Sequence, residues 1–85
     1  RQAELERYYG PKTFEEIEYE ADGKYLQQGW TKQPLKSGDG YRYFDGKGGS
    51  FQINRGYGPE ANPSHSGPYV KLTEGSWQFR ISIEQ

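Results

Sequence analysis

The sequence predicts an α+β domain in which one or two N-terminal helices pack on a four-stranded antiparallel sheet. Two observations carry this prediction: apolar residues recur at helical spacing before residue 29, and apolar and polar residues alternate with period two after residue 40. Helices that precede a series of strands are typical of the α+β class. With 85 residues and no linker, we expect a single domain over residues 1–85.

Two helices are expected near the N-terminus. Residues 2–9 favour a short helix, and Gly10-Pro11 must end it because proline disfavours helical geometry in the residue before it. Thr13 and Glu16 have the spacing of a capping box, so a second helix begins there.

The second helix has one apolar stripe, formed by Phe14, Ile17, Ala21 and Tyr25. Gly23 weakens this helix by roughly 1 kcal/mol. We expect the helix to end near Gln28, with Gly29 as its left-handed stop.

Strands are expected at residues 41–44, 50–54, 69–73 and 76–83. Alternation assigns an apolar face to Phe51, Ile53, Val70, Leu72, Trp77, Phe79, Ile81 and Ile83. The other face is polar and cationic, with Gln52, Asn54, Tyr69, Lys71, Thr73, Gln78, Arg80 and Ser82. The apolar face therefore covers the helix stripe, and the polar face is left for solvent or a ligand.

The composition limits the chemistry of the domain. Apolar residues make up 31% of the chain and aromatic residues 16%, so the core depends heavily on aromatic side chains. The chain has no cysteine and one histidine, which excludes disulfides and does not favour a protein-only transition-metal site. No apolar run is long enough for a membrane span. Because the chain starts at Arg1 and contains no methionine, we expect it to be a C-terminal piece of a longer protein.

Charge is unevenly distributed along the chain. Residues 1–22 hold seven acids and three bases, a net charge of -4, whereas residues 23–85 hold five acids and eight bases, a net charge of +3. This division indicates either a basic working surface apart from an acidic helix, or simply a solvated acidic helix face. The overall pI of 5.8 counts against a strong non-specific nucleic-acid binder.

Residues 55–69, RGYGPEANPSHSGPY, form a long predicted loop between two strands and contain His65, the only histidine. Structureless connections longer than about 12 to 15 residues are usually functional or disordered. A loop anchored by strands at both ends can bring His65 to the edge of the polar face.

These residue types suit cleavage of RNA by its own 2′-hydroxyl, a reaction that needs an acid, a base and positive charge but no metal or cofactor. His65 is the candidate acid or base, because histidine titrates near neutrality. Arg55, Lys71 and Arg80 are candidates for holding the phosphate. Candidate substrate contacts are Tyr69 and Tyr57, for base stacking or proton donation, and Asn54, Thr73 and Gln78.

Each of these residues also has a simpler interpretation. A polar sheet face is by default a solvated one, His65 in a Ser- and Pro-rich loop is often a turn residue, and Arg55 can cap a strand end. A competing hypothesis is a non-catalytic module whose Tyr- and Gly-rich loops bind a protein or glycan. A third is a toxin that attacks nucleotide cofactors or other small molecules.

The segment FQINRGYGPEANPSHSGPYVKL, followed by WQFRISI, resembles the toxin domains that end bacterial polymorphic and contact-dependent growth inhibition toxins. Many of those domains are similar in fold to the barnase, colicin and RelE group of ribonucleases, in which helices pack on an antiparallel sheet whose free face cuts RNA, often tRNA. The resemblance covers about residues 41–85 and highlights His65, Lys71 and Arg80, with Arg55 and Tyr69 behind them.

The resemblance also implies a biological setting. The domain is then an endoribonuclease toxin used in competition between bacteria and neutralised by a cognate immunity protein. It is delivered as part of a larger secreted or cell-surface bacterial protein and acts in the cytoplasm of the target cell.

Overall fold

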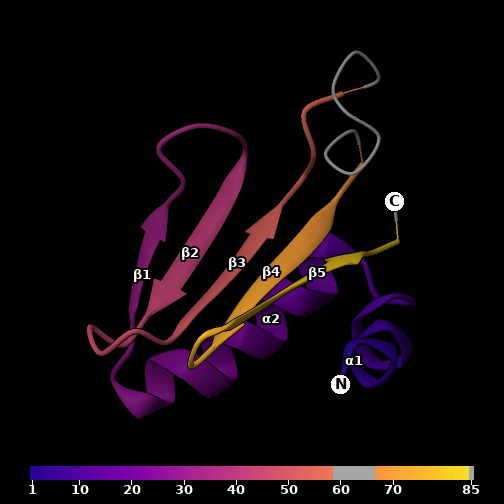
Figure 1. Cartoon of the computed structure of the whole chain (residues 1–85). Coiled ribbons are helices and arrows are strands. Elements are labelled where there is room, and N and C mark those ends of the chain that lie inside the picture. The colour runs from indigo at the N-terminus through magenta and orange to yellow at the C-terminus, as the bar shows by residue number, and fades with distance from the viewer. Residues whose placement is uncertain (59–66, 85) are drawn as a thin grey trace.

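The structure, a computed structural model that describes residues 1–58 and 67–84, is an α+β arrangement of two helices and one five-stranded antiparallel sheet (Figure 1). The elements are α1 (Gln2–Tyr9), α2 (Phe14–Tyr25), the 3-10 turn η1 (Leu26–Gln28), β1 (Thr31–Pro34), β2 (Gly40–Phe44), β3 (Ser50–Asn54), β4 (Tyr69–Glu74) and β5 (Trp77–Ser82). The strands are neighbours in the order of the sequence. The α+β class is therefore confirmed.

The expected number of four strands is wrong, because β1 precedes the four that the sequence indicates. Its residues TKQP show no apolar alternation and end in Pro34, so they carry no strand signal. Within the described residues, β1 is an edge strand that pairs with β2 alone, from Thr31 opposite Phe44 to Pro34 opposite Tyr41. Proline is tolerated there because an edge strand leaves some N–H groups without a ladder partner.

The capping box at the start of α2 is confirmed. The Glu16 amide donates to Thr13 Oγ1 at 3.2 Å, and the Thr13 amide donates to Glu16 Oε1 at 2.9 Å. The predicted end is also confirmed, since the helical segment closes through η1 and Gly29 has a φ of 84°. The chain then turns back so that the rings of Tyr25 and Trp30 lie 4.5 Å apart.

The core lies between α2 and the sheet, and Figure 1 shows α2 behind the sheet with α1 beside β5. The whole predicted stripe of α2 is buried, and so is most of the predicted apolar face of the sheet: Phe51, Ile53, Val70, Leu72, Ile81 and Ile83. Phe79 is partly buried against this core. Trp77, the first residue of β5, lies opposite Glu74 and is 69% exposed.

One ion network joins α2 to the first two strands. Lys32 Nζ of β1 lies 2.8 Å from Glu18 Oε2 and 3.0 Å from Asp22 Oδ1 of α2. The Tyr43 hydroxyl of β2 donates to the same Asp22 oxygen at 2.6 Å. Desolvation opposes ionisation of Asp22, but the hydrogen bonds from Tyr43 and Lys32 outweigh it and lower the pKa of Asp22.

No helix in the described ranges, residues 1–58 and 67–84, combines the length and the apolar character needed to cross a membrane.

An added methyl group is expected to have opposite effects on stability at two glycines, Gly40 and Gly23. A Cβ at Gly40 collides with the Ile53 carbonyl of the neighbouring strand, whereas a Cβ at Gly23 in α2 meets nothing within 4 Å. We predict that Gly40→Ala lowers the free energy of unfolding by about 1–3 kcal/mol through overpacking. Gly23→Ala, the matched control, raises it by about 0.5–1 kcal/mol through helix propensity. Urea denaturation measures both, and equal effects contradict the register of β2 and β3.

Acid is predicted to weaken the link between α2 and the sheet. Because the folded state lowers the pKa of Asp22 below its ordinary value of 3.8, this stabilisation is present above that value and is lost as the pH falls through the folded pKa. Asp22→Asn therefore lowers stability at neutral pH and makes it less dependent on pH under acid conditions. Denaturant midpoints as a function of pH test this, and a variant with the wild-type acid dependence contradicts it.

Candidate functional site

The candidate site is the side of the sheet that faces away from α2, here called the outer face. Strand register places five of its residues directly opposite one another, one on each strand: Gln33, Arg42, Gln52, Lys71 and Arg80. With neighbouring strands about 4.8 Å apart, this cationic row extends about 19 Å across the sheet. Three positive side chains and two amides thus lie along one line.

The rows on either side of the cationic row supply most of the other predicted contacts. Thr73 lies opposite Gln78 on one side, in a row with Phe44 and Ser50. Asn54 lies opposite Tyr69 on the other side. The structure therefore gathers six predicted site residues on one face: Asn54, Tyr69, Lys71, Thr73, Gln78 and Arg80.

Two of the guanidinium groups lie over aromatic rings. Arg42 Cζ lies 4.5 Å from the centroid of Phe44, and Arg80 Cζ lies 4.8 Å from the centroid of Tyr69. Stacking of this kind restricts the orientation of the guanidinium group. Tyr69 itself is buried, so its ring supports Arg80. Burial also raises the pKa of Tyr69, against the opposing charge of Arg80, so the phenol is protonated at neutral pH.

The two sides of the sheet differ in their charged residues. No acidic residue occurs among the described strand residues of the outer face. Carboxylates of the helices and of Glu74 pair with bases on the helix side: Glu15 with Arg55, Glu18 and Asp22 with Lys32, Glu20 with Lys12, and Glu4 and Glu74 with Arg1. The helix side therefore holds both acids and bases, whereas the charged strand residues of the outer face within the described chain are all bases.

Arg55 does not join the cationic row. Its Nη1 lies 2.6 Å from Glu15 Oε2 and its Nε 3.5 Å from Asp39 Oδ2, and its guanidinium lies 3.9 Å from the centroid of Phe14 on α2. Residue alternation explains this position, because Arg55 follows Ile53 by two residues and so shares the helix side. The hydrogen bond from Arg55 lowers the pKa of Glu15.

Asn54 is a structural residue of the outer face, because only 1% of it is exposed. Its Oδ1 accepts from the Gly56 amide at 2.7 Å, and its Nδ2 donates to the Tyr57 hydroxyl at 3.4 Å. These bonds fix the chain where it leaves β3 and hold Tyr57 in place.

Tyr57 borders a hollow of about 380 Å³ at the β1–β2 end of the cationic row. The hollow is lined by Gln33, Pro34, Leu35, Lys36, Ser37, Arg42, Gln52, Asn54 and Tyr57. The Tyr57 hydroxyl donates to the Ser37 carbonyl at 3.3 Å, and the residue is 46% exposed. Tyr57 is therefore placed as a wall of this hollow, with part of its surface open.

Sequence reasoning missed Arg42, Gln33 and Lys36. Arg42 had a usable signal, because the alternation of YRYF puts it opposite the apolar side of Tyr41 and Tyr43. Gln33 had none, because β1 was not recognised as a strand, and Lys36 lies in the loop between β1 and β2.

His65, the predicted acid or base, lies outside the described residues, so its position relative to the cationic row stays a prediction.

Comparison with known proteins adds no identification: no protein-family model matches the chain, and no curated protein or solved structure matches it either.

Proposed function

We propose that this chain is a metal-independent endoribonuclease domain that binds RNA on the outer face of its sheet. The cationic row is the observation that carries the proposal. Arg42 on β2, Lys71 on β4 and Arg80 on β5 lie in this row. No carboxylate occurs beside them among the described strand residues of the outer face. Phosphate groups are the natural partner of such a line, since Arg and Lys bind them with charge-assisted hydrogen bonds.

Single-stranded RNA suits this surface better than a duplex. Proteins bind unpaired nucleotides on sheet faces by combining cations for the backbone with exposed rings for the bases. Tyr57 offers a half-exposed ring beside the hollow, and Gln33 and Gln52 offer amide donors and acceptors within it. The row thus supplies backbone contacts and the hollow supplies space for a base.

The proposed reaction is attack of the 2′-hydroxyl on the adjacent phosphorus. A base removes the hydroxyl proton, the bond from phosphorus to the 5′-oxygen breaks, and an acid donates a proton to the leaving oxygen. His65 is proposed for one of these proton transfers. Lys71 and Arg80, with Arg42 in place of Arg55, stabilise the charge that develops on the phosphate oxygens.

The wider setting belongs to the same proposal. Helices on one side of an antiparallel sheet, with RNA on the other, is the arrangement expected of a barnase- or RelE-like toxin. We therefore propose that the domain is the toxin part of a larger bacterial protein used in competition, that tRNA is a candidate target, and that a cognate immunity protein covers the cationic row.

A recognition module without catalysis is the second candidate, because large aromatic side chains are exposed elsewhere. Tyr19 is 84% exposed and Trp77 69%. Exposed aromatic residues are common anchors of protein interfaces. In that case, substitution of these rings removes binding to a protein or glycan, and substitution of the cationic row does not.

The first functional prediction concerns RNA binding. Each cation that contacts a phosphate contributes about 0.7 to the slope of log affinity against log salt for single strands, so the row predicts a slope of about -2. Lys71→Gln weakens binding and makes the slope less steep by about 0.7. Fluorescence anisotropy with a short single-stranded RNA over a range of salt concentrations measures both quantities.

Arg7→Gln is the matched control, because Arg7 is exposed on α1 and the charge change is the same. Equal weakening by both substitutions shows that net charge, not the cationic row, governs binding.

The second functional prediction concerns cleavage. The wild-type domain cleaves RNA in the presence of a chelator, and His65→Ala slows cleavage by about 10²–10⁴-fold while RNA still binds. Gel analysis of total RNA and anisotropy measure the two effects separately. Intact RNA with the wild type, or unchanged cleavage by His65→Ala, contradicts the catalytic proposal but leaves RNA binding to its own test.

A further inference from the structure

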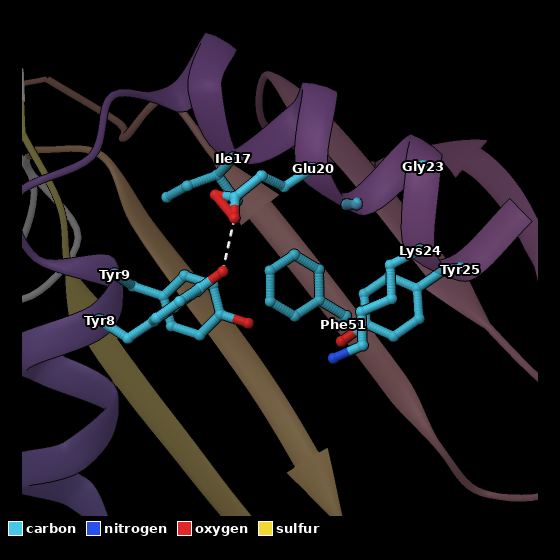
Figure 2. A pocket seen from close by; sticks show the side chains of 9 residues that line it. Tyr8, Tyr9, Ile17, Glu20, Gly23, Lys24, Tyr25 and Phe51 are labelled. Atoms are coloured by element: carbon cyan, nitrogen blue, oxygen red, sulfur yellow. Dashed lines mark hydrogen bonds between the residues drawn. The ribbon is translucent and has the colours of Figure 1, made fainter.

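A second pocket lies on the helix side of the sheet, remote from the cationic row. It has a volume of about 320 Å³ and is enclosed by the end of α1, one flank of α2 and Phe51 of β3 (Figure 2). This volume is at the lower end of the range for small-molecule sites. No step proposed for RNA uses this pocket.

The walls of the pocket are mainly aromatic. The ring centroids of Tyr9 and Phe51 lie 5.6 Å apart, and those of Tyr25 and Phe51 lie 5.3 Å apart. Ile17 and Ala21 of α2 add aliphatic surface. Figure 2 shows Phe51 at the back, with Tyr9 on one side and Tyr25 on the other. Phe51, Ile17 and Ala21 are buried and form the floor, whereas Tyr8 and Tyr9 offer accessible aromatic surface for an apolar group.

On one side of the rim, the negative charge of Glu20 is neutralised by an adjacent lysine. The Tyr8 hydroxyl donates to Glu20 Oε1 at 2.5 Å, the bond drawn in Figure 2, and Lys12 Nζ lies 3.0 Å from Glu20 Oε2. Lys12 also lies 3.4 Å from the centroid of the Tyr8 ring. The hydrogen bond from Tyr8 is the main cause of the lowered pKa of Glu20, so the carboxylate is ionised and matched by Lys12.

The other side of the rim carries a positive charge. Within the described part of the chain, Lys24 forms no ion pair, and its Nζ lies 5.1 Å from the centroid of the Tyr25 ring. Burial raises the pKa of both Tyr9 and Tyr25, so both phenols remain protonated. A hydrogen bond joins the two phenols and opposes the rise at Tyr25, so one phenol proton is left for a ligand. The pocket therefore combines an ammonium group and a phenol donor with an apolar interior, which suits an anion.

Gly23, between Glu20 and Lys24 on the rim, supports a ligand site. A glycine inside a helix costs roughly 1 kcal/mol relative to alanine. No packing contact requires it, because a Cβ there meets nothing within 4 Å. Because Gly23 has no side chain, the pocket entrance stays open at this point.

We propose that this pocket binds a carboxylate attached to an aromatic or aliphatic body. The body packs on the accessible parts of Tyr8 and Tyr9, above the buried Phe51, and the carboxylate pairs with Lys24 and accepts from a phenol. A cationic ligand does not fit, because the unmatched charge on the rim is itself positive. A free small acid and the C-terminus of a peptide with an apolar last residue present the same chemistry.

The test is an NMR titration of the whole domain with phenylacetate and with its neutral amide, phenylacetamide. We expect phenylacetate to shift the amide signals of Ala21, Gly23, Lys24 and Phe51, and phenylacetamide to bind at least about tenfold more weakly. A short peptide ending in phenylalanine, with a free or an amidated C-terminus, forms the second arm. Stronger binding of the free peptide acid than of phenylacetate assigns the site to a chain terminus, and the reverse assigns it to a small acid.

Lys24→Gln is expected to weaken phenylacetate binding at least about tenfold, since it removes a charge-assisted hydrogen bond. Tyr9→Phe, which keeps the ring, is expected to weaken it less. Lys47→Gln, an exposed position in the β2–β3 turn, leaves it unchanged, and thermal melting confirms that each variant is folded. Equal binding of acid and amide, binding that survives Lys24→Gln, or no binding of either probe overturns the proposal. RNA binding is measured separately and does not depend on Lys24.

Discussion

The constraint on which the structure depends is that a single layer of helix covers only one side of the sheet. Every strand presents alternate residues to opposite sides, so burying Phe51, Ile53 and Val70 against α2 necessarily turns their neighbours outward. The capping box and the link from Lys32 to Asp22 fix α2 on its side. The outer face is then held in place by a core that it does not itself form.

That separation also resolves an apparent conflict in the charge of the molecule. A pI of 5.8 counts against nucleic-acid binding when charge is taken as an average. The structure instead pairs acidic residues of the helices with bases on the helix side and leaves Arg42, Lys71 and Arg80 on the other side. Among the described strand residues, the charges on the outer face are thus all positive although the whole molecule is slightly acidic.

Local signals in the sequence predicted most of the fold and part of the candidate site. The capping box, the helix stripe and the alternation in β3–β5 depend on neighbouring residues, and all appear in the structure. β1 could not be found, because TKQP lacks a local strand pattern and becomes a strand only by pairing with β2. Arg55 was grouped with Lys71 and Arg80 as a cation, but alternation places it with Glu15. The pocket beside Lys24 depends on the spacing of two helices, which no sequence pattern specifies.

The outer face is the surface that we propose RNA contacts. The most direct measurement is a map of backbone amide shifts on titration with single-stranded RNA. We expect the largest shifts on β2, β4 and β5 around Arg42, Lys71 and Arg80, and little change along α2. Shifts concentrated on α2 and the pocket beside Lys24, with the strands unaffected, would contradict the central claim.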